Sequence, residues 1–437
     1  MTDELQDFID DLEQAVKIGR ETILEIVGAE DEHFGPFSDR TIKRRFTRKD
    51  AAELVGVTAD AIIKAEKAGK LPEPDKDEKK KMLGYTIYQI DHMRSYFKTY
   101  PWKAENEEAR VLCVTNLKGG CYKTTLSTYI SQFAALNGRR VLFIDTDPQG
   151  SGSVLMNKMP DEPLTEPVNE FTKQIFRDAE LGDDRAIEIK ESLQSDHYHL
   201  TIGPLAESLE NHEFEDLSYA IQSTHWPNLD IIQSSIALSL SNLVIQKLLS
   251  DDSVQPEMIY TYLRAGIEKH KKDYDLIVFD SSPDVAFNNV NLVAAADMVL
   301  MPAPLDFIDY HASVRYLEVF KEAFVYLQSN LSKADFGSKK VFRVLPTKFD
   351  KTNEISTRML SIVNDSFERF LLKGQPVISF TQQVPVGNFT LRSIYETEPH
   401  NRSSREAHSR AIKIFANAFE PIMNELESAW PSKQDYL

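Results

Sequence analysis

The sequence predicts a mostly parallel, doubly wound α/β sheet, preceded by an N-terminal helix and a small helix-turn-helix unit. From residue 109 onward, strand-like apolar runs alternate with helical segments, which is typical of a parallel sheet. A Gly-rich turn joins the first of these runs to a helix. Before residue 100, two helical segments flank a turn that contains Gly56. The chain has 437 residues, enough for two or three domains.

Residues 1–40 are expected to contain an amphipathic helix over residues 3–27. Its apolar positions recur mainly at spacings of three and four: Leu5, Phe8, Ile9, Leu12 and Val16. A helix of this length suits a dimer contact, and packing on its own domain is an equal alternative. The first 40 residues hold 3 Lys or Arg and 12 Asp or Glu, so this segment is strongly acidic.

The second predicted unit spans residues 41–100 and contains the helix-turn-helix. Thr47 is placed to cap a first helix that ends at Gly56, and Thr58 is placed to cap a second helix. Residues 85–88 follow a Lys-rich tract and predict part of a β-hairpin wing. The arrangement resembles the winged helix-turn-helix of MerR-like regulators, which implies sequence-specific DNA binding.

The charge distribution favours the same interpretation. A net charge of −18 for the whole chain argues against nucleic-acid binding, but residues 41–98 hold 14 Lys or Arg and 9 Asp or Glu. The candidate DNA-binding residues in this basic island are Lys43, Arg44, Arg45, Arg48, Lys64 and Lys67. A three-helix packing domain with a solvated charged face is the alternative.

Residues 101–109 begin with a proline, are mostly polar, and are expected to link this unit to a sheet domain of residues 110–437. Residues from about 155 to 225 predict helices inserted at one edge of the sheet. The strands are expected at 111–115, 141–144, 229–232, 276–279, 298–301 and 341–345.

The Gly-rich turn is the octapeptide KGGCYKTT, which begins at Lys118. Between a strand and a helix, such a turn lets backbone N–H groups wrap a phosphate, and the helix N-terminus adds its positive dipole. Lys123 is placed to reach the β and γ phosphates of a nucleotide and is expected to be catalytic, and the Thr124 hydroxyl is placed to bind Mg²⁺. The other residues of the loop that we expect to bind the nucleotide are Gly119, Gly120, Cys121, Tyr122 and Thr125.

This loop departs from the usual pattern G-x-x-x-x-G-K-[ST] because a second lysine, Lys118, stands five residues before Lys123. The sequence K-G-G-x-x-K-T-[ST] resembles the deviant Walker A motif of the ParA/MinD family of ATPases. The resemblance implies a P-loop ATPase fold and a homodimer that ATP promotes. It also implies that Lys118 is catalytic and contacts the ATP bound to the other subunit.

Two further motifs place carboxylates beside this loop, because ligands of open α/β sheets lie beyond the carboxyl ends of the strands. The sequence D-x-D-P-Q-G from Asp145 onward resembles the Walker A′ motif of ParA proteins. That resemblance implies that Asp147 positions the attacking water and that Asp145 supports the Mg²⁺ shell. Residues 276–280 resemble a Walker B strand, which implies that Asp280 holds a Mg²⁺-bound water.

The resemblance also suggests less specific sites. Thr347 and Pro385 are expected near the nucleotide base, with ordinary loop positions as an equal alternative. Basic residues near the C-terminus are candidates for binding DNA without sequence preference in the ATP-bound dimer, unless they form only a solvated helix face. These residues are Arg392, Arg402, Arg405 and Arg410.

The function that the resemblance implies is that of a DNA-partitioning ATPase. ATP hydrolysis to ADP and phosphate would be stimulated by a ParB-type centromere-binding protein, and the helix-turn-helix would bind an operator to repress the protein's own operon. A nucleotide-gated transcriptional regulator is the alternative. A MinD-like positioning ATPase is less favoured, because the tail at 424–431 is acidic and interrupted by proline rather than basic and amphipathic.

Cysteine usage and hydropathy limit the remaining classes. No cysteine follows Cys121, which excludes a nitrogenase-type iron protein with its cluster ligands. Cys113 and Cys121 are poorly placed for a disulfide, which fits a reducing cytosol. The sequence has no signal peptide and no run of 18 apolar residues, so we expect a cytoplasmic, nucleoid-associated protein with no membrane contact.

Overall fold

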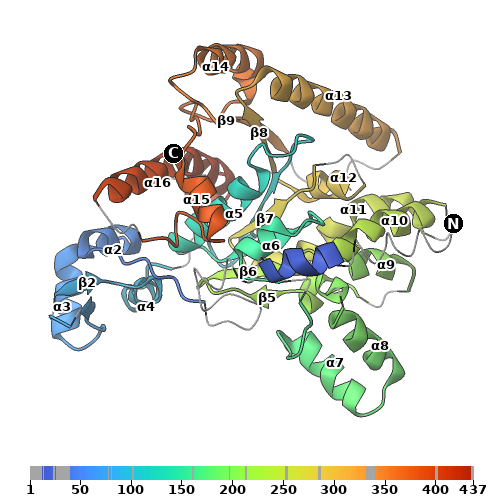
Figure 1. The fold of residues 1–437 in the computed structure, drawn as a ribbon, viewed down its shortest axis with the longest axis horizontal. Helices are drawn as coiled ribbons and strands as arrows, with labels where there is room; N and C mark the ends of the chain where they lie inside the picture. The colour runs from blue at the N-terminus through green and yellow to red at the C-terminus, as the bar shows by residue number, and fades with distance from the viewer. Residues whose placement is uncertain are drawn as a thin grey trace.

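The structure, a computed structural model, is one seven-stranded sheet with helices on both faces, a small N-terminal unit, and a pair of helices that projects from the body (Figure 1). It describes residues 12, 14–22, 25, 40–76, 78–79, 81–100, 103–159, 162–195, 197–211, 214–250, 254–283, 287–330, 340–398 and 402–434.

The main sheet has the strand order β5-β6-β4-β7-β3-β8-β9. Every neighbouring pair is parallel except β5 and β6. This order confirms the mostly parallel α/β sheet and the six predicted strands, and the two-residue β5 is an addition. The strands are β3 (Arg110–Val114), β4 (Val141–Asp145), β5 (Gln222–Ser223), β6 (Leu229–Ile232), β7 (Leu276–Asp280), β8 (Met298–Pro304) and β9 (Val341–Thr347).

Two hydrophobic cores lie on the two faces of this sheet. Because side chains alternate along a strand, Leu112 and Val114 join one core while Val111 and Cys113 join the other. The first core is closed by α5 (Lys123–Leu136) and α16 (Arg402–Glu427). The second is closed by α9 (Gly203–Asn211), α10 (Ser241–Leu249), α11 (Pro256–Glu268), α12 (Phe287–Ala295), α13 (Phe307–Asn330) and α14 (Glu354–Phe367).

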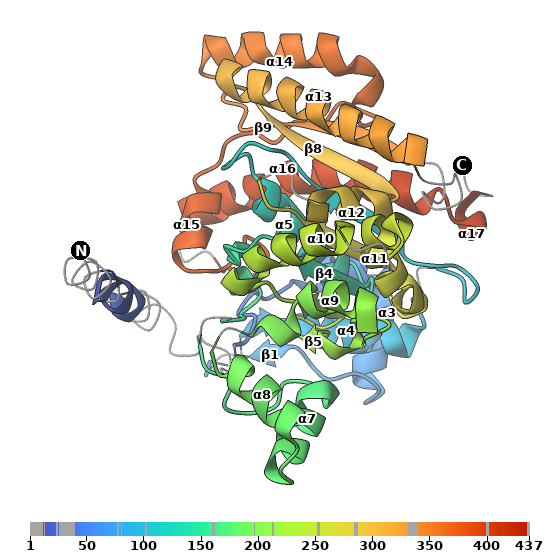
Figure 2. The ribbon, with the colours of Figure 1, turned by 90° about the vertical axis from the view of Figure 1, so that its right-hand side faces the viewer.

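The predicted helical insertion between β4 and β5 is confirmed. Within it, α7 (Glu170–Glu180) and α8 (Asp184–Leu193) project from the body as a pair, which Figure 2 shows most clearly. The pair packs around its own small core of Leu164, Ile189, Leu193 and Leu200. The remaining short helices are α6 (Ser151–Leu155), α15 (Gln383–Phe389), α17 (Pro431–Gln434) and the 3-10 turns Tyr198–Leu200, Leu217–Tyr219, Ile236–Leu240, Lys269–Lys272 and Glu368–Phe370.

The N-terminal unit consists of three helices and a two-stranded antiparallel ribbon. Thr47 caps the first helix in a capping box with Asp50, Gly56 ends it in the left-handed conformation (φ 77°), and Thr58 caps the second helix. The sequence therefore located both helices and the turn between them. The elements are α2 (Arg48–Val55), α3 (Ala59–Lys67), β1 (Asp75–Lys76), β2 (Met82–Gly84) and α4 (Ile87–Phe97).

The assignment of residues 85–88 to the ribbon was wrong. The second strand ends at Gly84, and Tyr85 pairs with Phe46 instead. Thr86 then caps α4 in a capping box with Gln89, so the following apolar residues begin a helix. Gly84 is required here because its φ is 119° and a Cβ would lie 2.6 Å from the Phe46 carbonyl oxygen.

The N-terminal unit shares the first hydrophobic core with the sheet. Arg94 of α4 is 2% exposed, and its guanidinium donates to the carbonyls of Leu54 (3.0 Å) and Leu136 (2.5 Å). Leu136 is the last residue of α5, where helix carbonyls lack partners within the helix and favour a cation. Arg94 therefore joins the N-terminal unit to the C-terminal end of α5.

Of the helix predicted over residues 3–27, residues 14–22 are described and are helical and exposed, as are Leu12 and Glu25. The rest of that prediction lies outside the described residues. Across the part of the chain that the structure describes, no helix has both the length and the hydropathy needed to cross a bilayer.

Candidate nucleotide-binding site

The phosphate loop connects the end of β3 to the start of α5, as the sequence predicted. Gly120 has a φ of 68°, and Tyr122, which stands where the usual pattern has its second glycine, has a φ of 79°. A tyrosine in this left-handed region is uncommon, so the loop is held in a specific conformation. The loop lies at the N-terminus of a 14-residue helix, which is suited to anion binding.

The two lysines of the loop have different surroundings. Lys123 is 6% exposed, and its ammonium donates to the carbonyl oxygen of Lys118 at 3.0 Å. An ammonium has three donors, so a neutral acceptor on one of them leaves donors for phosphate oxygens. The Lys118 ammonium instead forms an ion pair with Asp309 at 3.0 Å, near the start of α13.

Asp145 and Asp280 lie side by side, because they are partners in the register of β4 and β7. Asp145 accepts hydrogen bonds from the Ser153 N–H (2.7 Å), the Ser153 hydroxyl (2.8 Å) and the Asp147 N–H (3.1 Å). Both of its oxygens therefore accept hydrogen bonds, one from the turn that follows β4 and the other from α6. These bonds make Asp145 a positioning group for the segment that follows β4, and its support of a Mg²⁺ shell stays a prediction.

Asp280 is fully buried, and neither of its oxygens has a hydrogen-bond partner among the described residues. Burial raises its pKa well above the usual value, and the charge of Asp145 raises it further, whereas the hydroxyls of Thr124 and Ser127 lower it. The Ser127 hydroxyl donates to the backbone carbonyls of Lys123 and Thr124. An unpaired buried carboxylate is costly unless a ligand completes it.

A magnesium ion fits this arrangement. Its preferred ligands are oxygens, and it usually keeps several waters while binding one or two protein groups and the phosphates of the substrate. Asp280 supplies the unpaired carboxylate and Thr124, at the start of α5, a hydroxyl. Within the described residues no group of three or more His, Cys, Asp or Glu could hold a metal.

Asp147 is 8% exposed and accepts a hydrogen bond from the N–H of Gln149 (3.0 Å), which fixes the turn that follows β4. It lines the same cavity as the phosphate loop. The structure therefore brings together two of the three residues predicted to be catalytic, Lys123 and Asp147, on one cavity. The third, Lys118, lies in the same loop but is directed to Asp309.

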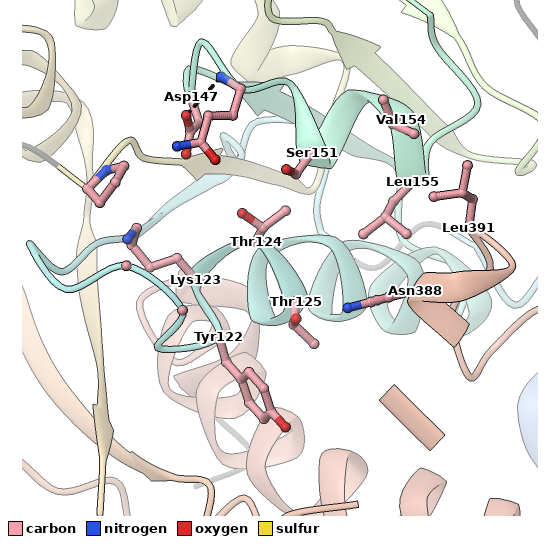
Figure 3. A pocket seen from close by; sticks show the side chains of 14 residues that line it. Tyr122, Lys123, Thr124, Thr125, Asp147, Ser151, Val154, Leu155, Asn388 and Leu391 are labelled. Carbon is pink, nitrogen blue, oxygen red and sulfur yellow. Dashed lines mark hydrogen bonds between the residues drawn. The ribbon is translucent and has the colours of Figure 1, made fainter. Parts of the chain in front are cut away.

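The cavity has a volume of about 530 Å³. Figure 3 shows it running along α5, with Lys123 at one end and Asn388 and Leu391 at the other. Several residues that line it were not among those predicted from the sequence to bind the nucleotide. They are Gln149, Ser151, Val154, Leu155, Pro283, Asn388 and Leu391.

Comparison with known proteins decides the family. An AAA-domain family model matches residues 109–333. Protein SopA of Escherichia coli strain K12 is 32% identical over 422 residues, which cover 95% of each chain. The chain belongs to the ParA family of partition ATPases. Cell division protein PomZ of Myxococcus xanthus is 25% identical over 371 residues, or 84% of this chain and 92% of PomZ.

A solved partition protein has the same fold as this ParA-family chain. It covers 94% of this chain and 99% of its own length, with a TM-score of 0.54 and 17% identity. Within this fold, Thr347 ends β9 and its buried hydroxyl lies 3.5 Å from the Cys121 carbonyl, so it supports the phosphate loop. Pro385 is exposed on α15 and does not line the cavity, whereas Asn388 of the same helix does.

Three of the six basic residues predicted to bind DNA in the N-terminal unit are already engaged within it. Arg44 lies over the ring of Phe46 at 4.6 Å, Arg45 pairs with Asp75 at 3.2 Å, and Arg48 pairs with Glu66 at 3.2 Å. The other three side chains are exposed, and they are Lys43, Lys64 and Lys67.

The C-terminal basic residues also divide into two groups. Arg392 is 8% exposed, and its guanidinium donates to the Thr41 carbonyl at 3.4 Å, so its prediction as a surface DNA contact was wrong. Arg405 and Arg410 are exposed on α16. The side chain of Arg402 lies outside the described part of the chain.

Proposed function

We propose that this protein is a DNA-partitioning ATPase that hydrolyses ATP to ADP and phosphate. The main support is a phosphate loop with two lysines beside the unpaired buried carboxylate of Asp280. The similarity of the chain to SopA over 95% of its length adds to it. Lys123 and the backbone N–H groups of the loop would bind the β and γ phosphates. Thr124 and Asp280 would hold Mg²⁺, which neutralises phosphate charge when bound.

Phosphoryl transfer requires orientation and charge stabilisation more than covalent chemistry. In this proposal Asp147 orients the attacking water from its fixed turn, and Asp145 keeps that turn in place through Ser153. Lys123 is the one cation among the described residues that line the cavity. Hydrolysis by the isolated protein should therefore be slow, and a ParB-type centromere-binding partner would stimulate it.

The proposed active form is a homodimer in which Lys118 leaves Asp309 and contacts the ATP of the second copy. Two large apolar side chains beside this ion pair support such an interface, because Phe307 is 63% exposed and Ile308 70% exposed at the start of α13. A second copy packed against the start of α13 would remove both apolar side chains from water. Exchange of a partly exposed ion pair for a phosphate contact costs little.

Two DNA-binding surfaces complete the proposal. The N-terminal unit would act as a winged helix-turn-helix that binds an operator, with Lys64 and Lys67 exposed on its second helix. Arg405 and Arg410 on α16 would bind phosphates without sequence preference in the ATP-bound dimer, and so associate the protein with the nucleoid. We propose residues 41–100 as the operator-binding domain and 110–437 as the ATPase domain, joined by the linker 101–109.

The test is DNA binding with ATP, with ADP and without nucleotide. Two probes, random-sequence DNA and the DNA upstream of the protein's own gene, would be used at one fixed salt concentration. Lys123→Ala should abolish the ATP effect, whereas Lys173→Ala, an exposed lysine on the projecting helix α7, should not. We expect ATP to promote binding to random DNA selectively. Binding to the upstream probe alone, without that ATP effect, would instead indicate a nucleotide-gated transcriptional regulator.

A further inference from the structure

The far wall of the nucleotide cavity is held by the N-terminal unit. Leu391 lines the cavity and has a φ of 53°, a left-handed conformation that residues with a branched side chain seldom adopt. Its carbonyl oxygen accepts a hydrogen bond of 2.5 Å from the Arg40 guanidinium. Strained backbone of this kind persists only where surrounding contacts hold it, and Arg40 supplies such a contact from outside the sheet domain.

Arg40 belongs to a buried charged cluster that we call the clasp, consisting of Arg40, His225 and Glu396. The side chains of Arg40 and Glu396 are fully buried, with 3.3 Å between a guanidinium nitrogen and a carboxylate oxygen. The His225 ring contacts the same oxygen, and the Ser393 N–H donates to the other at 2.8 Å. Burial would raise the pKa of Glu396, but Arg40 and His225 lower it to about 2.

The clasp joins three segments that are far apart in the sequence. Arg40 leads into the N-terminal unit, His225 lies between β5 and β6, and Glu396 follows α15. Two further bonds reinforce the junction: Tyr88 of α4 donates to the His225 carbonyl at 2.7 Å, and Arg392 donates to the Thr41 carbonyl at 3.4 Å. The N-terminal unit is therefore fastened to the segment that forms the cavity wall.

The turn between the cavity wall and the clasp is closely packed. The Arg392 N–H donates to the Gly387 carbonyl at 2.9 Å. A Cβ at Gly387 would lie 2.4 Å from the Arg392 carbonyl oxygen, which leaves no space at this crossing. A displacement of Asn388 or Leu391 by an occupant of the cavity would thus be passed to Arg392 and Glu396.

We propose that the clasp couples occupancy of the nucleotide cavity to the position of the N-terminal unit. Arg40 is a positioning residue: it holds Leu391 in the cavity wall, so nucleotide binding and docking of α2–α4 stabilise each other. Coupling between two sites is reciprocal, so docking strengthens nucleotide binding by the same factor by which nucleotide favours docking, and loss of the clasp should remove this shared factor. The inference rests on the proposed function in one respect, that the cavity binds ATP.

The test is hydrogen exchange of the full chain with and without Mg²⁺–ATP, together with the measured Kd for ATP. In the wild type, ATP should slow exchange in the phosphate loop, in residues 390–397 and in α2–α4. The double variant Arg40→Met, Glu396→Gln removes both charges of the buried pair and so leaves neither one unpaired. It should bind ATP at least about five-fold more weakly. At saturating ATP, the gain in protection from hydrogen exchange should remain in the phosphate loop but be lost in α2–α4.

Two further variants keep the test decisive. Lys76→Met, Glu73→Gln removes an exposed ion pair within the same unit that does not touch the cavity, and it should behave as wild type. Leu391→Gly keeps the clasp and the carbonyl that Arg40 binds, but it removes the side chain that lines the cavity. ATP should then no longer raise the protection of α2–α4, and this result does not depend on how the double variant folds.

The outcomes separate the two proposals. Wild-type protection of the phosphate loop with no change in α2–α4 would overturn the coupling and leave the proposed function intact. The coupling would also be overturned if the clasp variant bound ATP as tightly as the wild type and kept the ATP-dependent protection of α2–α4. The clasp would then hold the two parts together without linking them to nucleotide binding. Failure of the folded wild type to protect its loop would overturn the proposed function itself.

Discussion

Two aspartates beside the central strand β3 lie at opposite ends of the parallel strands, and their surroundings differ. We call the side where the strands begin the amino edge and the side where they end the carboxyl edge. At the amino edge, Asp297 accepts a hydrogen bond from the Val111 N–H at 2.8 Å and pairs with Arg110 at 3.2 Å. At the carboxyl edge, Asp280 has no hydrogen-bond partner for either oxygen among the described residues. The first carboxylate is satisfied by the fold, whereas the second is left for a ligand.

Two buried lysines repeat this difference. Lys103, at the amino edge, is 4% exposed and donates to the carbonyls of Glu107 (3.0 Å) and Lys272 (2.9 Å). Lys123, at the carboxyl edge, has one such backbone contact, to Lys118. The buried charged groups that support the sheet therefore have their hydrogen-bond partners within the protein, whereas those beside the phosphate loop keep donors or acceptors for a ligand. In this molecule, incomplete satisfaction of buried charge indicates function more directly than burial does.

The largest predicted effect comes from the lysine at the carboxyl edge. Lys123→Ala should weaken ATP binding by at least about 100-fold, because a buried ammonium on the phosphates contributes roughly 3 kcal/mol. Lys103→Met should instead lower the free energy of unfolding by about 1–3 kcal/mol, because it leaves two carbonyls unsatisfied. Calorimetric titration with ATP and urea unfolding of both variants check this. Similar losses of ATP affinity in the two variants would contradict the comparison.

A third carboxylate, that of Glu396, lies near the nucleotide cavity and has partners, unlike that of Asp280. The pH dependence of stability should reveal these partners. The pKa of Glu396 is lowered from 4.5 to about 2 by Arg40 and His225, against burial. A lowered folded-state pKa contributes stability that is present above pH 4.5 and lost as the pH falls toward 2. Between pH 4.5 and about 2, the free energy of unfolding of the wild type should fall by on the order of 3 kcal/mol more than that of Glu396→Gln. Denaturant unfolding at each pH measures it, and parallel pH profiles would contradict it.

Substitution of the two aspartates should change stability in opposite directions. Without nucleotide or metal, Asp280→Asn should raise the free energy of unfolding by about 1 kcal/mol, because it removes a buried unpaired charge. Asp297→Asn should lower it by about 1–3 kcal/mol, because it weakens the bonds to Val111 and Arg110. Urea unfolding in the presence of a chelator measures both. A loss of stability in Asp280→Asn would mean that its carboxylate is satisfied by the fold.

The sequence predicted what local signals encode. The strands, the phosphate loop, Asp147 and Asp280 follow from apolar runs and from the rule that ligands lie beyond carboxyl strand ends. Residues 85–88 were misassigned because their aromatic and β-branched character resembles a strand, while the capping pair Thr86 and Gln89 was the stronger signal. It marks the start of α4.

Other features could not be read from the sequence because they depend on tertiary contact. The clasp joins positions 40, 225 and 396, and no local pattern relates them. The cavity wall at Asn388 and Leu391 comes from a short helix and turn without a phosphate-binding motif. Arg392 was grouped with the other basic residues near the C-terminus, yet the turn directs it to the Thr41 carbonyl.

The smallest predicted effect concerns the two ion pairs that flank β3. Lys118–Asp309 and Arg110–Asp297 have similar lengths, 3.0 and 3.2 Å, and similar partial exposure. Each pair should contribute less than about 1 kcal/mol to stability. Only the first must open for Lys118 to reach a nucleotide in a second copy, so Asp309→Asn should favour the ATP-dependent dimer by up to about five-fold, whereas Arg110→Met should not. Sedimentation velocity with Mg²⁺–ATP measures the difference, and equal dimerisation of the two variants would show that the Lys118 pair does not restrain assembly.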